Sequence, residues 1–198
     1  MGRPRQFDEE QAVRAACRVF WAKGYEGTST QDLCEATGLG RSSIYNTFKS
    51  KNHVFLRALS YYVDTMTGRQ IAILDQEGPS AAERLRELLS VIVDSEMENR
   101  RSGYGSGCFT VNTITGLAAS DPKVADVLEK DLERRLTSLR AVVAEGKRDG
   151  SVGSPRAAEG LAWYVTAVIS GMRIAAQSGA DRTVMEDIAR SGLDALAH

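Results

Sequence analysis

Residues 30–48 read TQDLCEATGLGRSSIYNTF, and this stretch decides how the N-terminal part of the chain folds. Two short helical segments flank residues 38–40 (Gly-Leu-Gly), and a connection of this length makes two helices cross steeply, as in a helix-turn-helix. Apolar residues recur at helical spacing, so one face of each segment can pack inward. The predicted inward side chains are Leu33, Ala36, Leu39, Ile44 and Phe48.

The outer face of the second segment is polar and rich in hydrogen-bond donors. Such a face suits a recognition helix that contacts base edges and phosphates in a major groove. Lys49 and Lys51 follow it, where their ammonium groups and the free N–H groups of the next helix can bind phosphate. The alternative is a helical hairpin whose polar side chains are only solvated. The outward residues are Arg41, Ser42, Ser43, Tyr45, Asn46 and Thr47.

The rest of the sequence is also helical by pattern, which predicts an all-α fold of about nine helices. Apolar residues recur every three or four positions, and proline occurs only four times. Capping residues mark several predicted starts, namely Asp8, Ser80, Asp121-Pro122, Ser154-Pro155 and Asp181. The predicted helices span residues 8–23, 30–37, 41–48, 51–74, a segment opening at 80, 108–118, 121–149, 154–178 and 181–196.

The order of short and long helices predicts two domains. Residues 1–50 are expected to form a three-helix helix-turn-helix DNA-binding domain, and residues 51–198 a C-terminal helical bundle for ligand sensing and dimerisation. The helix over 51–74 links the two. Residues 1–57 hold nine Lys or Arg and six Asp or Glu, whereas the remainder holds sixteen and twenty. This localised positive charge favours a nucleic-acid face.

Composition disfavours several classes of protein. There is no run of eighteen apolar residues to span a membrane, and the basic N-terminus lacks the apolar core of a signal peptide, so we expect a cytoplasmic protein that joins the nucleoid when bound to DNA. Three cysteines without a CxxC pair and two histidines predict no metal site, and no cofactor is expected. The glycines at 103, 105 and 107 lack the strand and GK[ST] sequence of a phosphate-binding loop, which disfavours an enzyme.

Residues 1–57 resemble the DNA-binding domain of the TetR repressor family. The resemblance implies a ligand-responsive homodimeric repressor that binds a palindromic operator and is released by a small-molecule effector. The polar surface alone leaves protein binding or transcriptional activation open. The matching positions are Arg5-x-Phe7-Asp8, Ala15-x(4)-Phe20-x(3)-Gly24-Tyr25-x(2)-Thr28-Ser29 and Gly38-Leu39-x(4)-Ile44-Tyr45-x(2)-Phe48-x(2)-Lys51-x(3)-Phe55.

The resemblance also implies roles for residues of the recognition helix. Tyr45 is similar to a tyrosine that contacts a phosphate. Arg41, Ser43 and Asn46 occupy positions that meet bases or backbone. Lys51 matches a lysine that opens the fourth helix near the DNA.

Other implied contacts flank that helix. Thr28 and Thr30 match positions where the second helix meets the DNA backbone, and Arg3 and Arg5 can enter the minor groove from an N-terminal arm. Asn46-Thr47 departs from the aromatic or His pair of many family members, which implies an altered operator preference.

The last two predicted helices carry wide apolar faces that other helices must cover. The resemblance implies that they pair with those of a second subunit, and a two-fold operator calls for two recognition helices. An intramolecular core is the alternative. The apolar positions are Leu161, Ala162, Val165, Val168, Ile169, Met172, Ala175 and Ala176, then Val184, Ile188, Leu193 and Leu196.

The sequence Gly107-Cys108-Phe109-x(2)-Asn112 resembles a subgroup of TetR-like regulators, and some relatives with a cysteine here respond to electrophiles or oxidants. Cys108 lies near a predicted helix N-terminus, which lowers the pKa of a thiol. Inert packing is the alternative.

Effector-site candidates are polar or aromatic residues on otherwise apolar helices. Arg173 lies within an apolar helix and needs a partner, either a ligand carboxylate or an acid of the second subunit, and the second is favoured. Trp163 also suits a core or an interface. The candidates are Met66, Tyr104, Cys108, Phe109, Asn112, Trp163, Thr166, Arg173 and Gln177.

Overall fold

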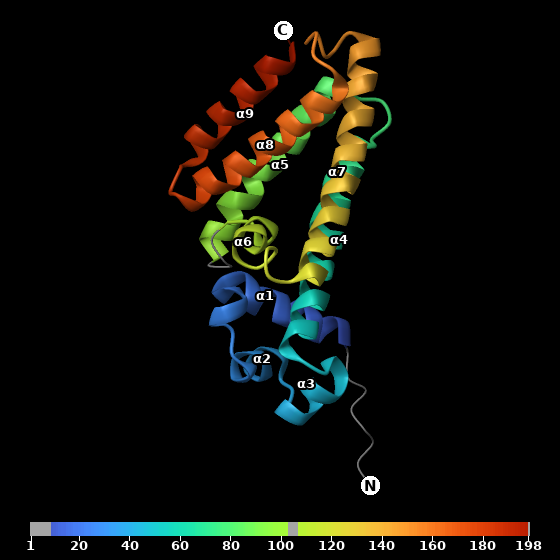
Figure 1. The fold of residues 1–198 in the computed structure, drawn as a ribbon. Helices are drawn as coiled ribbons and strands as arrows, with labels where there is room; N and C mark the ends of the chain where they lie inside the picture. The colour runs from blue at the N-terminus through green and yellow to red at the C-terminus, as the bar shows by residue number, and fades with distance from the viewer. Residues whose placement is uncertain (1–8, 103–106, 198) are drawn as a thin grey trace.

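The computed structural model describes residues 9–102 and 107–197, and within them the chain consists of nine helices without a strand. The predicted all-α fold is therefore confirmed. Figure 1 shows α1, α2 and α3 at one end of an elongated molecule, with the long α4 running from them into a larger bundle. These four are α1 (Glu9–Gly27), α2 (Thr30–Thr37), α3 (Arg41–Phe48) and α4 (Lys51–Leu74).

In the larger bundle the upper part of α4 lies among other long helices, and a short helix lies between this bundle and α1 (Figure 1). The short helix is α6 (Phe109–Gly116). The long ones are α5 (Ala81–Ser102), α7 (Pro122–Asp149), α8 (Ala158–Gln177) and α9 (Arg182–Ala197). Among the described residues, no helix is both long and apolar enough to cross a membrane.

Side-chain caps explain why several helices begin where they do. Ser29 and Asp32 form a reciprocal capping box, in which the Asp32 N–H donates to Ser29 Oγ at 3.1 Å and the Ser29 N–H donates to Asp32 Oδ2 at 2.7 Å. Ser80 and Glu83 repeat this arrangement as predicted. Asp121 accepts from two backbone N–H groups at the start of α7, which confirms that cap as well. The predicted cap at Asp8 lies outside the described residues.

Two predicted helix boundaries differ from the structure, and a third is found as a break within α1. α8 begins at Ala158 rather than at Ser154-Pro155, because residues 151–157 run along the end of the bundle, where the Ser154 N–H donates to Leu196 O at 3.1 Å. α6 ends at Gly116, two residues before the predicted end. At Gly24 the backbone takes φ 71° and ψ 174°, which is not helical, so the regular helix breaks there as predicted and a short further turn leads to Gly27.

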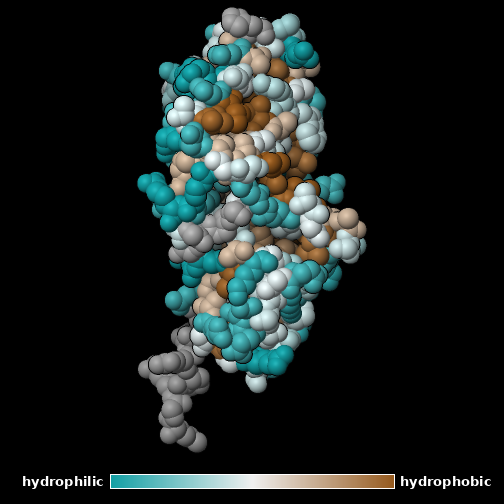
Figure 2. Space-filling view, turned by 90° about the vertical axis from the view of Figure 1, so that its left-hand side faces the viewer, coloured by the Kyte–Doolittle hydropathy of each residue, from teal (hydrophilic) through white to brown (hydrophobic). Residues whose placement is uncertain are grey.

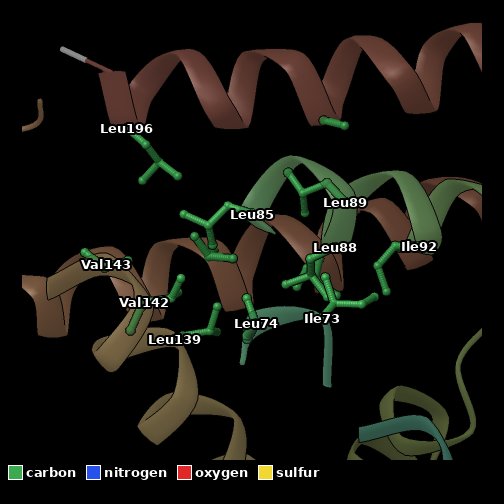
Figure 3. Close-up of a cluster of buried hydrophobic side chains, with 14 of the residues drawn as sticks. Ile73, Leu74, Leu85, Leu88, Leu89, Ile92, Leu139, Val142, Val143 and Leu196 are labelled. Atoms are coloured by element: carbon green, nitrogen blue, oxygen red, sulfur yellow. The ribbon is translucent and has the colours of Figure 1, made fainter. Parts of the chain in front are cut away.

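Two hydrophobic cores stabilise the two ends of the molecule. The first joins α1–α4 and includes Phe20, Phe48 and Phe55, with Phe109 of α6 packed against them. The second fills the larger bundle, where Figure 3 shows leucines of α5 meeting side chains of α4, α7 and α9. Because α4 contributes to both cores, it couples the small helical group to the bundle.

Gly146 gives a direct test of packing in the second core. A Cβ at this position would lie 2.5 Å from Val152 Cγ2 and 2.9 Å from Ala81 Cβ. The better helix propensity of alanine is worth up to about 1 kcal/mol, but the clash costs more, so Gly146→Ala should lower the free energy of unfolding by about 1–3 kcal/mol. Urea denaturation followed by circular dichroism measures this. Gly68→Ala is the control, because nothing lies within 4 Å of its Cβ position, and equal stability of the two variants would contradict the packing account.

Candidate DNA-binding surface and effector site

The helix-turn-helix forms as the sequence predicts. Gly38 takes a left-handed conformation (φ 69°, ψ 14°) that ends α2, and α3 begins one short turn later. Ile44 and Phe48 are each 2% exposed and pack into the first core with Leu33. Ala36 was expected to face inward, but it lies on the solvent side of α2 and is exposed.

The outer face of α3 is open to solvent along its whole length. Tyr45 is 39% exposed, and its hydroxyl shares a hydrogen bond with Thr30 Oγ1 at 3.2 Å. This hydrogen bond and the nearby Arg41 guanidinium lower the pKa of Tyr45. The exposed predicted DNA contacts are Arg41, Ser42, Ser43, Tyr45, Asn46 and Lys49.

Two lysines lie where α3 passes into α4. Lys49 ends α3 with a positive φ of 63°, and Ser50 then caps α4 by accepting from the His53 N–H. Lys51 is half-buried, and its Nζ lies 4.4 Å from the centre of the Tyr25 ring. The Tyr25 ring therefore fixes the position of this ammonium group at the start of α4.

Thr28 does not reach this surface. It is 1% exposed, and its hydroxyl donates to Gly24 O at 2.6 Å, so it stabilises the turn between α1 and α2. Arg3 and Arg5 lie outside the described residues. Thr30, at the start of α2, does contact the α3 face through its hydrogen bond with Tyr45.

Charge distinguishes this end of the molecule. No Asp or Glu occurs over residues 36–63, which contain Arg41, Lys49, Lys51 and Arg57. Residues 36–63 themselves therefore offer phosphate groups cations and hydroxyl groups. Two carboxylates from other helices reach α4, where Asp121 accepts from Asn52 and Glu9 pairs with Arg57.

A buried polar cluster surrounds Cys108 in the bundle. Cys108 is 1% exposed and directly precedes α6, and Arg173 of α8 donates from a guanidinium nitrogen to its Sγ at 2.8 Å. The Thr110 hydroxyl lies 2.9 Å from the same sulfur, and the Tyr62 hydroxyl donates to it at 3.6 Å. The thiol is thus surrounded by groups that stabilise a negative charge.

Opposing effects act on the pKa of the Cys108 thiol. Burial raises it, but Arg173, the Thr110 hydroxyl and the Val111 N–H together lower it below its ordinary value. Burial and the neighbouring sulfur raise the pKa of Tyr62, which stays a neutral donor. This arrangement favours the thiolate.

Arg173 finds its acidic partner within the same subunit. Its Nε lies 3.8 Å from Glu96 Oε1 of α5, and both side chains are less than 10% exposed. The expectation that a second subunit supplies this acid is therefore wrong. Among the described residues, Arg173 Nε has no hydrogen-bond acceptor.

The structure brings some of the other effector candidates together and separates the rest. Gln177 Nε2 is 3.5 Å from Asn112 Oδ1. Met66 packs against the first core, which contains Cys108 and Phe109. Thr166 only bonds to Ala162 O within its own helix, and Trp163 is 48% exposed. Tyr104 lies outside the described residues.

The sequence reasoning missed three partners of this cluster, namely Tyr62, Glu96 and Thr110. A signal existed for Glu96, which follows Ile92 by four positions and so continues the apolar stripe of α5. Glu96 on the apolar stripe of α5 and Arg173 on that of α8 together indicated a buried ion pair. In the part of the chain that the structure describes, no cluster of three potential metal ligands occurs.

The predicted apolar stripes of α8 and α9 are partly intramolecular. Ala162, Val165, Ile169 and Met172 are buried against neighbouring helices of the same chain. Other apolar residues on the two helices remain exposed, and Figure 2 shows hydrophobic residues gathered on the half of the molecule that holds the bundle. The exposed ones are Trp163 at 48%, Ile174 at 52% and Val184 at 46%.

Two family models match the chain. The first, described as bacterial regulatory proteins of the tetR family, matches residues 12–58, and the second, described as a tetracyclin repressor-like C-terminal domain, matches residues 81–191. Over 192 residues the chain is 29% identical to the HTH-type transcriptional repressor ComR of Escherichia coli K12, covering 97% of this chain and 90% of that one. It is 28% identical to the repressor BdcR of the same organism, covering 90% of this chain and 83% of that one.

A solved structure agrees with these relatives. It is a cysteine mutant of the TetR family transcriptional regulator CifR complexed with 26 bp operator DNA, and it matches with a TM-score of 0.82 and 30% identity over 98% of this chain and 100% of that one. The matches run along nearly the whole sequence and include the helix-turn-helix and the bundle. The chain therefore belongs to the TetR family of bacterial regulatory proteins and is a transcriptional repressor of the TetR type, not an enzyme.

Proposed function

We propose that this repressor inserts α3 into the major groove of a palindromic operator. Arg41, Ser42, Ser43, Tyr45 and Asn46 contact base edges and the DNA backbone, and Thr30, Lys49 and Lys51 bind phosphates. The observation that carries this proposal is the exposed face of α3, set in a segment without acidic residues. Residues 1–50 form the DNA-binding domain and residues 51–198 the sensing and dimerisation domain.

Tyr45→Ala should weaken operator binding about ten- to a hundredfold, because it removes an exposed aromatic ring and a hydroxyl that the Thr30 bond orients. Fluorescence anisotropy with labelled duplex measures the change, and thermal melting checks the fold. Ile114→Ala on α6, where Ile114 is 51% exposed, is the control for truncating an exposed side chain elsewhere. Normal operator affinity in a folded Tyr45→Ala protein would remove Tyr45 from the site.

We further propose that two copies assemble through the exposed sides of α8 and α9. Large apolar side chains facing solvent on both helices support this, since such patches mark association sites. A symmetric dimer presents two copies of α3 to a two-fold operator, which one short helix could not read with useful specificity.

Ile174→Glu should raise the dissociation constant of the dimer at least about tenfold, because pairing would bury two unpaired carboxylates. Light scattering over a dilution series measures the mass. Ile114→Glu makes the same change on an equally exposed residue of α6 and should leave the mass unchanged. A dimer that resists Ile174→Glu would place the interface elsewhere.

We also propose that the cluster around Cys108 is the effector site and that a small electrophile is its ligand. The thiolate, held charged beforehand by Arg173, would add to an activated alkene: a carbon–sulfur bond forms as the carbon–carbon π bond breaks, and a proton from water neutralises the resulting carbanion. Trp21 Nε1 donates to Gly107 O at 2.7 Å, so a displaced Cys108 would disturb a contact of α1. This gives a physical route from the effector to the DNA-binding domain.

A further inference from the structure

A cavity lies where the C-terminal part of α1 meets α4 and α6, and its lining does not include Cys108. It has a volume of about 300 Å³ and is lined by the C-terminal part of α1, by Phe55 of α4 and by α6. Figure 1 shows α6 lying between α1 and the bundle at this point. The volume is at the lower end of the range for small-molecule sites in proteins.

Aromatic rings form the floor of this cavity. The Phe55 ring packs edge to face on Phe20, Tyr25 and Phe109, with centroids 5.0, 5.1 and 5.6 Å apart. A further ring added to such a cluster finds faces and edges to pack against. The two charged residues of the lining, Lys23 and Glu26, have opposite signs, and Lys23 is already paired with Asp32. The walls therefore suit an uncharged aromatic molecule.

Two side chains of the cavity lining, Phe109 and Trp21, contact Tyr62 of the Cys108 cluster. Phe109 lines the cavity, and its ring packs on Tyr62 at 5.4 Å, while Tyr62 donates to Cys108 Sγ from the other side. Trp21 also lines the cavity and packs on Tyr62 at 5.2 Å. A molecule in this space would contact the DNA-binding domain through α1 and the bundle through α6.

We propose that this cavity is a second effector site, which takes a small, uncharged aromatic molecule. Its occupant changes operator affinity by fixing how α1 sits against α6, and it needs no reaction at Cys108. By linkage, a molecule that prefers one arrangement of α1 and α6 shifts the protein toward that arrangement.

Trp21 supplies the readout, because the chain has only two tryptophans and Trp163→Phe leaves Trp21 as the single one. The probe is 4-bromobenzyl alcohol, whose bromine quenches a tryptophan it touches. Titration into the full-length Trp163→Phe protein should give saturable quenching, and saturating probe should change operator affinity at least about threefold. The quenching experiment contains no DNA, so it can fail while the proposed operator binding holds.

Gly116→Leu should fill the cavity, since Gly116 lines it and open space surrounds its Cβ position. This variant should bind the probe at least about tenfold more weakly. Gly68→Leu makes the same change at another open position outside the cavity and should bind normally. Quenching that does not saturate, or that Gly116→Leu leaves unchanged, overturns the site. Saturable quenching without any change in operator affinity overturns its role as an effector site.

Discussion

Replacing Arg173 with methionine is expected to raise the pKa of the Cys108 thiol and to slow its alkylation near neutral pH about tenfold or more. Arg173 is the main group that lowers this pKa against the effect of burial. An adjacent opposite charge typically lowers the pKa of an acidic group by roughly 1–3 units. Below its pKa the thiolate fraction falls with falling pH. The pH at half-maximal alkylation rate should therefore move upward in the variant.

Iodoacetamide labelling followed over a pH series measures this shift. Cys34→Ser removes the half-exposed cysteine, and burial raises the pKa of Cys17 to about 12, so Cys108 dominates the labelling. Arg173→Lys keeps the positive charge and should retain most of the effect, whereas Cys108→Ser should abolish the labelling and any response of DNA binding to electrophiles. An unchanged pH profile in Arg173→Met would contradict the role of Arg173.

The same variant should lose stability, because Glu96 remains buried without its cation. Removing one partner of a buried ion pair costs about 3–5 kcal/mol. Burial already raises the pKa of Glu96 against the lowering effect of Arg173, so its folded pKa rises further in the variant. The loss of stability should therefore be small below the ordinary pKa of a carboxyl group. It should grow as the pH rises from there through the raised pKa of Glu96 in the folded variant. The double variant Arg173→Met, Glu96→Gln should recover stability without recovering thiol reactivity.

Phe55→Ala is expected to lower the free energy of unfolding by about 3–5 kcal/mol. Phe55 is 1% exposed and makes three edge-to-face contacts, which reach α1 and α6 from α4. Its loss opens a cavity where the DNA-binding domain joins the bundle, and each aromatic pair adds about 0.5–1.5 kcal/mol beyond its buried area.

Urea denaturation followed by circular dichroism measures this cost. Phe55→Leu keeps most of the volume and should lose clearly less, and Ile114→Ala removes an exposed side chain and should cost little. A loss below about 1 kcal/mol in Phe55→Ala would mean that the two ends of the molecule do not depend on this contact.

Local signals explain why so much of the fold could be predicted. Gly38 allowed the left-handed end of α2, and Ser80 and Asp121 cap helices through atoms a few residues away, so short-range chemistry decided these boundaries. Ser154-Pro155 carried an equally good signal, but contacts with the end of α9 hold that segment extended. Tertiary contacts override local propensity there.

The same contrast between local signals and tertiary contacts applies to the candidate sites. The outward face of α3 follows from helical periodicity within eight residues, so its exposed polar set could be read from sequence. The Cys108 cluster joins α4, α5, α6 and α8, and no spacing within one helix shows which residues meet. Thr28 differs from what the family resemblance implied. Its position matched a DNA contact, but its side chain is buried and its hydroxyl donates to Gly24 O.

Binding of the protein to duplex from its own upstream intergenic region tests the central claim most directly. Fluorescence anisotropy at about 50 and 200 mM salt, with unrelated duplex as control, should give nanomolar and sequence-selective binding. Affinity should fall roughly 10³–10⁵-fold between the two salt concentrations, as expected for about six to ten phosphate contacts by a dimer. Absence of binding at the lower salt concentration, or equal affinity for both duplexes, would contradict the assignment of α3 as a specific reader of an operator in that region.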